Sequence, residues 1–437
     1  MNDPSRSRSS ASDNLMKTDS FSQIRLGFVV AFAAMVFSSD LSAANEREWM
    51  SRQGGTVLAV LASTTDSEVV LVTPESRQIR VRITDLSLAD RQHLIEYGGA
   101  DASIITEGDP GTPEKDVRLD SSTMDRRAEK LTIGDGSYSE YDVYETPHFW
   151  IATNGRMRPN ALAETAERLW HGMAFQHMNF RTDWGDRRML IIAVEDTDAY
   201  EELGQWVARE AAKRDADAGE RIAATWSRVG ATRIGLPVEF MEKHKLLPSA
   251  QVFNVRDASD FRRAMVPFQV NCLAGALLAH QMGGVSSFGA EGYFAVTTGH
   301  AYYKEILLGG ESQTNQLAVD GTGHDEFSSK SGFQDGKSWA RTLRTLVRRG
   351  NHKLDLEEVL KWSVNDLDPG KLVTIYAFSY YMQSDAKRLS SYASMVRRIE
   401  SSNQIPEPIE IARIFGHESV EAFNEDWAKF VVEGSFR

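Results

Sequence analysis

The order of strand-like and helix-like segments constrains this chain more than any other feature of its sequence. Three apolar runs typical of buried strands are HFWIATNG (148–155), RRMLIIAV (187–194) and AQVFNV (250–255), and helix-like segments separate them. After residue 335 nearly every segment has helical periodicity, for example SWARTLRTLVRR and KLVTIYAFSYYMQ. We therefore expect an α+β fold, with a mixed sheet and its helices first and a helical C-terminal lobe last.

Residues 46–97 have the pattern of a separate small unit at the front of the chain. Apolar residues alternate with their neighbours around Val57, and the β-rich runs EVVLVT and QIRVRI are joined by a polar turn. The segment DLSLADRQHLIEY is typical of a short capped helix. These parts predict a small β-barrel.

Within this unit, three local features resemble a known family. They are Trp49, the Gly54–Gly55 pair and the motif Leu86-Ser87-x-x-Asp90. Their pattern resembles the first homology domain of the yeast Sla-type endocytic adaptor, which is SH3-like. The resemblance implies an SH3-like β-barrel over residues 45–98 that binds short peptides. The alternative is a spacer domain with no specific ligand.

Residues 1–44 have the layout of a secretory signal peptide behind a polar, Ser-rich start. Arg25 precedes the apolar run LGFVVAFAAMVF, and the small residues of SSDLSAAN then offer a cleavage point at Ala43 or Ala44. The apolar run is shorter than the roughly 20 residues that a membrane span needs. We therefore expect cleavage and export to the periplasm, the cell envelope or the exterior, with no stable membrane span afterwards. Retention of the segment as an anchor is the alternative.

Composition excludes some function classes. The net charge of -13 argues against nucleic-acid binding, because phosphate contacts need clustered Lys and Arg, and it also disfavours acidic substrates. Cys272 is the single cysteine, so no intrachain disulfide can form, and we expect it to be a small buried residue. Residues 99–138 are rich in Gly, Pro, Ser and charge, which predicts a linker.

Three stretches in residues 139–437 match the order of motifs in one enzyme family. They are ALLAHQ (276–281), where that family has HELTHQ, FGAEGYF (288–294), where it has W-x-x-E-G-x-A-x-Y, and IFGHESVEAFNEDWAKFV (414–431), which looks like its terminal helix. The region resembles the gluzincin metallopeptidases, in particular their exported peptidase MA-like domains. The resemblance implies a zincin-like domain. Two histidines four positions apart and a glutamate from the next helix would bind zinc, and a second glutamate would be the general base.

Only half of that site is present in this chain. Ala276 stands at the first ligand position and Leu277 at the general-base position, whereas His280 and Glu291 stand at the second and third ligand positions. An alanine cannot coordinate zinc and a leucine cannot accept a proton. We therefore expect no catalytic residue, no bound metal and no cofactor, and we expect His280 to be a core or cleft histidine bonded to a carbonyl or to Glu291.

The first functional hypothesis is an exported, non-catalytic peptidase-like protein. It would bind a peptide or protein in the cell envelope, in a cleft lined by His280, Glu291, Phe288 and Tyr293. Loss of the first histidine and of the general base motivates this hypothesis.

Two alternatives remain open. One is a zinc metallohydrolase that uses a rearranged ligand set of His280, Glu291 and His300, with His324 as a further candidate ligand. The other is a structural envelope scaffold in which neither module has a ligand. The sequence contains no glycine-rich phosphate loop, no GxSxG elbow and no cysteine pair that would indicate other chemistry.

Overall fold

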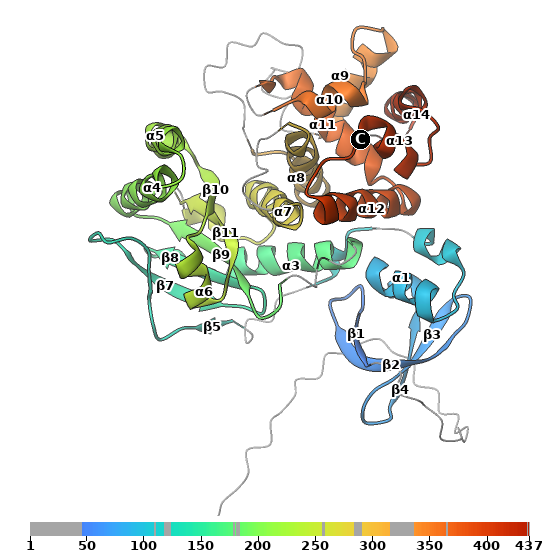
Figure 1. Ribbon diagram of the computed structural model, residues 1–437, viewed down its shortest axis with the longest axis horizontal. Coiled ribbons are helices and arrows are strands. Elements are labelled where there is room, and N and C mark those ends of the chain that lie inside the picture. The colour runs from blue at the N-terminus through green and yellow to red at the C-terminus, as the bar shows by residue number, and fades with distance from the viewer. Residues whose placement is uncertain are drawn as a thin grey trace, which may run out of the picture. The chain divides into compact units, whose positions relative to one another are not determined.

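The computed structural model describes residues 46–108, 111–117, 124–177, 180, 184–255, 258–283, 291–314, 336–363, 366–434 and 436. The predicted signal peptide, Phe288 and His324 lie outside these residues. The described chain is α+β, with an N-terminal antiparallel sheet, a mixed sheet with helices and a helical C-terminal region (Figure 1). Within the same residues, no helix combines the length and the apolar character that crossing a membrane requires.

The N-terminal sheet pairs its strands antiparallel in chain order. Its elements are β1 (Arg47–Met50), β2 (Thr56–Thr64), β3 (Glu68–Val72) and β4 (Gln78–Arg82), followed by η1 (Ile83–Asp85) and α1 (Leu88–Tyr97). No pairing joins β1 to β4, so the described strands form an open sheet and not the closed barrel that we expected. Trp49 is 1% exposed in its core, and the indole N–H donates to the carbonyl of Ala59 at 3.0 Å.

The Ser87-x-x-Asp90 motif has a structural role in this unit. Ser87 Oγ accepts a hydrogen bond from the backbone N–H of Asp90 and so caps the start of α1. The buried carboxylate of Asp90 accepts from the N–H of Met50 at 2.9 Å and pairs with Arg47 at 2.6 Å. The motif therefore fixes α1 against β1.

Residues 99–138, which the composition predicts to be a linker, contain short elements. These are η2 (Ala102–Thr106), α2 (Pro113–Asp116), β5 (Asp125–Arg126) and β6 (Leu131–Thr132). Both β5 and β6 pair with β7 (Glu140–Glu145), so the second half of this stretch belongs to the mixed sheet. In α2, Glu114 is 1% exposed.

The mixed sheet has the strand order β10-β11-β9-β8-β7-β5, and β6 also pairs with β7. Its remaining strands are β8 (Phe149–Asn154), β9 (Arg188–Val194), β10 (Ala231–Gly235) and β11 (Leu246–Asn254). The central pairs β8–β9 and β9–β11 are parallel, and the other pairs are antiparallel. Strand β10 therefore lies at one edge.

Both faces of the central strand β9 are buried, which explains its unbroken apolar sequence. Successive side chains of a strand point to opposite faces. Ile191 packs with Leu169 of α3 (Asn160–Gln176) in one core, and Ile192 packs with Leu203 of α4 (Thr197–Ala212) in the other. Shorter helices complete this region: α5 (Ala216–Thr225), η4 (Trp226–Arg228), α6 (Val238–His244) and η5 (Ala258–Phe261).

The helical region is built around α8, which lies between α7 and α11 (Figure 1). Its helices are α7 (Pro267–Gln281), α8 (Tyr293–Gly309), α9 (Gly336–Arg348), α10 (Leu356–Lys361), α11 (Pro369–Met382), α12 (Ala386–Ser402), α13 (Pro408–Ile414) and α14 (Val420–Glu433). Gly299 permits the close approach of α8 to α11, because a Cβ there would lie 2.4 Å from the carbonyl oxygen of Ile375. Trp339 and Trp427 are fully buried in this core.

Candidate functional site

Helix α7 carries the two positions that the sequence resemblance assigns to the first ligand and the general base. Ala276 is 3% exposed and Leu277 is fully buried, and both belong to the core that α7 shares with the sheet and the helical region. A methyl group and an isobutyl group thus occupy these positions. Neither can bind a cation or accept a proton.

His280 and Glu291, the two residues that the resemblance assigns as ligands, lie on either side of residues 284–290, which are outside the described part of the chain. His280 is half-buried in the last turn of α7, and the Trp184 ring meets its ring edge-on at 5.6 Å. Glu291 is exposed and precedes α8, and its carbonyl accepts the N–H of Tyr293 at 2.9 Å. Tyr293 begins α8 and packs partly against the core, and burial raises the pKa of its phenol.

His300 has different surroundings from either of these residues. It is fully buried on α8, stacked on the ring of Tyr392 at 6.1 Å and 6.0 Å from the ring of His177. Burial holds the pKa of His300 well below its ordinary value, and the Lys304 cation lowers it further. Burial also lowers the pKa of His177, so His177 and His300 are a pair of neutral histidines in the core.

The residues present do not fit a zinc site of the family type. Such a site needs three protein ligands around one ion. Across the residues that the structure describes, no three His, Cys, Asp or Glu side chains come together in a way that could hold a metal. The rearranged set of His280, Glu291 and His300 is not assembled there.

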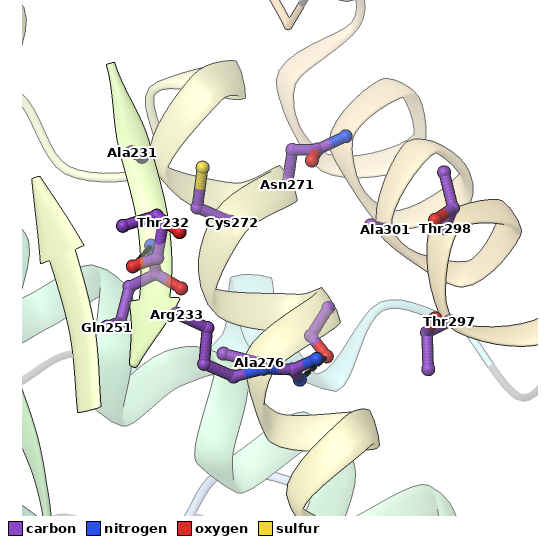
Figure 2. A pocket seen from close by; sticks show the side chains of 11 residues that line it. Ala231, Thr232, Arg233, Gln251, Asn271, Cys272, Ala276, Thr297, Thr298 and Ala301 are labelled. Atoms are coloured by element: carbon purple, nitrogen blue, oxygen red, sulfur yellow. Dashed lines mark hydrogen bonds between the residues drawn. The ribbon is translucent and has the colours of Figure 1, made fainter. Parts of the chain in front are cut away.

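A cavity of about 70 Å³ opens beside Ala276, between β10, β11, α7 and α8 (Figure 2). Its lining consists of Ala231, Thr232, Arg233, Gln251, Asn271, Cys272, Gly275, Ala276, Thr297, Thr298 and Ala301. Of these residues, Ala276 is at a position that the sequence resemblance assigns to a site. The overlooked signal is Arg233, a charged residue in the middle of a short strand.

Arg233 is the charged residue of this lining. It is 9% exposed, and its side chain runs from β10 past Ala276, where Nη1 donates to the carbonyl of Gly275 at 3.5 Å (Figure 2). Burial lowers the pKa of Arg233 to about 10. The guanidinium therefore keeps its positive charge at neutral pH.

The buried carboxylate of Glu305 is hydrogen-bonded to Asn271, which is part of the cavity wall formed by α7. Asn271 Nδ2 donates to Glu305 Oε2 at 2.8 Å, and the backbone N–H groups of Gln313 and Thr314 donate to Glu305 Oε1. Burial raises the pKa of Glu305 to about 7 despite these hydrogen bonds. Asn271 is thereby held in one orientation at the edge of the cavity.

The backbone of β10 faces outward beside this cavity. Interstrand hydrogen bonds of 2.9 Å join Gly230 to Asn254 and Leu236 to Pro248, at the two ends of the β10–β11 ladder. Hydrogen-bonded pairs alternate in an antiparallel ladder. The N–H and C=O groups of Ala231, Arg233 and Gly235 therefore point away from β11, to an edge with no strand partner among the described residues.

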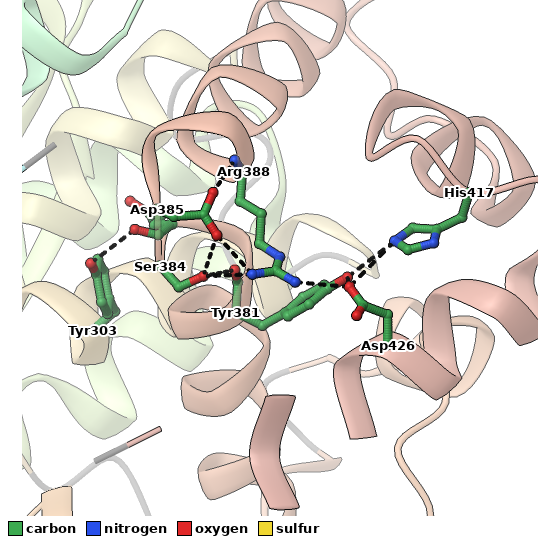
Figure 3. Close-up of polar contacts among 8 residues, drawn as sticks. Tyr303, Tyr381, Ser384, Asp385, Arg388, His417 and Asp426 are labelled. Atoms are coloured by element: carbon green, nitrogen blue, oxygen red, sulfur yellow. Dashed lines mark hydrogen bonds and ion pairs between the residues drawn. The ribbon is translucent and has the colours of Figure 1, made fainter. Parts of the chain in front are cut away.

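A second polar cluster lies in the helical region (Figure 3). Tyr381 of α11 donates to Asp426 of α14 at 2.7 Å, and Arg388 of α12 pairs with the same carboxylate at 2.8 Å. His417 Nε2 lies 3.2 Å from the Tyr381 hydroxyl. The cluster ties three helices together, and we assign it a structural role.

Comparisons of the chain with protein-family models, with curated proteins and with solved structures gave no match. The case for a function therefore depends on the geometry of the cleft and on the motifs of the sequence.

Proposed function

We propose that this chain is an exported, non-catalytic, peptidase-like protein that binds an extended peptide along the edge of β10. The observation that carries the proposal is the outward-facing backbone of Ala231, Arg233 and Gly235 beside the cavity at Ala276. An added strand can pair with the N–H and C=O groups that an open strand edge presents.

The chemistry of α7 supports binding in preference to hydrolysis. Ala276 and Leu277 cannot supply a metal ligand or a general base, and both are buried. A peptide held at β10 would therefore meet no activated water from these positions. The gluzincin-like motifs are consistent with a peptide-binding site at this place, and the signal-like N-terminus supports export.

The N-terminal unit is a second candidate peptide-binding module. Its SH3-like assignment rests on Trp49, the Gly54–Gly55 pair and the Ser87-x-x-Asp90 cap. We keep it secondary, because the cap and the tryptophan are both committed to packing and hydrogen bonds inside the unit.

Paired substitutions at Gly235 test the peptide edge. Nothing lies within 4 Å of the position that a Cβ would take at this residue, so both alanine and proline can be tried there. Gly235→Pro removes an outward N–H without removing a hydrogen bond to β11, whereas Gly235→Ala keeps that N–H. The probe is an equimolar mixture of randomised seven-residue peptides incubated with the full chain, with bound peptides counted by mass spectrometry.

We expect the wild type and Gly235→Ala to retain peptides, and Gly235→Pro to retain several-fold fewer at an unchanged melting temperature. Cleaved peptides in the same samples would favour the zinc hydrolase. Equal retention by all three proteins would rule out the β10 edge, and no retention by any of them would favour the scaffold.

A further inference from the structure

The charge of the cavity is opposite to that of the whole chain. The chain has a net charge of -13, yet the described residues that line the cavity include one arginine and no acidic side chain. Charges more than about 8 Å apart in water are largely screened at physiological salt. The exposed acidic residues elsewhere on the chain therefore do not decide what binds in the cavity, where Arg233 is the charged side chain of the described lining and the Glu305 carboxylate lies behind Asn271.

The backbone and the side chain of Arg233 could both contact a bound strand. Its backbone N–H and C=O point to the open edge of β10, while its side chain lines the cavity between β10 and α7 (Figure 2). In paired strands, directly opposite residues have Cβ atoms about 4.5–5.5 Å apart. The peptide residue opposite Arg233 would therefore lie within reach of the guanidinium.

The size of the cavity limits the group that can enter. Its volume is about 70 Å³, whereas roughly 10–15 Å³ on a comparable measure is enough to hold one water molecule. There is room for a small planar group such as a carboxylate. Thr232, Asn271 and Thr298 give the lining further polar atoms.

We propose that the cavity binds a carboxylate of the peptide and that Arg233 determines this specificity. This inference rests on the proposed peptide-binding function and names the class of its ligand. Arginine matches a carboxylate well, because its planar fork can donate two parallel hydrogen bonds to the two oxygens. The carboxylate can come from an Asp or Glu side chain or from the C-terminus of the peptide.

The test repeats the selection with two forms of the randomised mixture, one with amidated and one with free C-termini. Enrichment of Asp and Glu over Asn and Gln in the amidated pool identifies a side-chain carboxylate. Preference for the free-acid pool identifies a C-terminal one. We expect one of these preferences to be about tenfold in the wild type, the usual worth of a hydrogen bond to a charged group.

Three variants assign the preference to Arg233. Arg233→Met should abolish it, and Arg233→Lys should keep part of it because the charge remains. Arg221→Met is the control, since Arg221 is an exposed arginine on α5, away from the cavity lining, and it should behave as the wild type. The discrimination by the wild type is informative even if a variant at residue 233 does not fold.

A second probe separates this inference from the proposed function. Sodium propionate, compared with sodium chloride at equal ionic strength, should raise the melting temperature of the wild type more than that of Arg233→Met. If peptides are not retained but propionate has this effect, the carboxylate site stands and the peptide proposal fails. If peptides are retained without regard to carboxylates and Arg233→Met changes nothing, the carboxylate site is wrong and the peptide proposal stands. If the wild type neither retains peptides nor responds to propionate, both the peptide proposal and the carboxylate site are contradicted.

Discussion

Two neutral histidines deep in the core are the most unusual residues of this fold. His177 follows the end of α3 and His300 lies on α8, and both are at most 1% exposed. Burial lowers the pKa of His177 to about 3, with a smaller contribution from the Lys304 cation. Burial therefore favours the neutral form of each ring in the folded chain.

These histidines predict acid sensitivity. Because their pKa values in the folded chain lie below the ordinary value of 6.5, the unfolded chain binds more protons once the pH falls below 6.5. The free energy of unfolding should then fall as the pH drops below 6.5, by at most about 1.4 kcal/mol per pH unit for each histidine, and for His177 this loss should end at about pH 3. Urea unfolding of the wild type and of His300→Phe at several pH values measures this slope.

Glu305 acts in the opposite direction, since its raised pKa gives a contribution to stability that is lost as the pH rises from 4.5 through 7. Glu305 is present in both the wild type and His300→Phe. The difference between their free energies of unfolding at each pH therefore reports the contribution of His300. Parallel curves for the wild type and His300→Phe would contradict the account of the buried rings.

Single residues also mark the limit of what the sequence could predict. The motif around Ala276 and Leu277 located the cleft-facing helix, because a local pattern is enough to recognise it. Arg233 was not predicted, since its place in the cavity depends on a strand that meets α7 some 42 residues further along the chain. Phe288 and His324, which were named as candidates, lie outside the described residues.

At the scale of the elements, the strong periodic segments were the ones that could be predicted. Strands β8, β9 and β11 have long apolar runs, whereas β10 is a five-residue strand with an arginine at its centre. Short edge strands bury little apolar surface and so leave a weak pattern. The N-terminal strands were also recognised, but whether they close into a barrel depends on pairing between β1 and β4, which no local pattern reports.

One buried ion pair joins three elements that are far apart in the sequence. Lys304 Nζ of α8 lies 2.6 Å from Glu114 Oε1 of α2 and 2.6 Å from Gln176 Oε1 of α3. The two charged side chains are 3% and 1% exposed. The pair thus attaches α2, in the segment that composition predicts to be a linker, to the core of the helical region.

Removing one charge of this pair should be costly. Lys304→Met leaves the Glu114 carboxylate buried without its cation, and we expect a loss of about 3–5 kcal/mol in the free energy of unfolding. Lys304→Met combined with Glu114→Gln removes both charges and should recover much of that loss. Urea unfolding of the two variants provides the measurement, and a change below about 1 kcal/mol for Lys304→Met would show that the pair does not hold α2 in place.

At the scale of the whole molecule, we propose that the fold presents a peptide-binding cavity without catalytic chemistry. Helix α7, the edge strand β10 and the cavity between them are present, while the ligand and base positions are filled by buried apolar side chains. The described lining of the cavity has one arginine and no acidic side chain, although the chain as a whole is acidic. These features together favour recognition of a peptide over its hydrolysis.

The zinc content of the full chain tests this account most directly. The protein is equilibrated with excess zinc, dialysed exhaustively and analysed by elemental mass spectrometry beside His280→Ala. We predict far less than one zinc ion per chain and no difference between the two proteins, because one imidazole and one carboxylate do not complete a tetrahedral site. One zinc ion per chain in the wild type, lost in His280→Ala, would contradict the account.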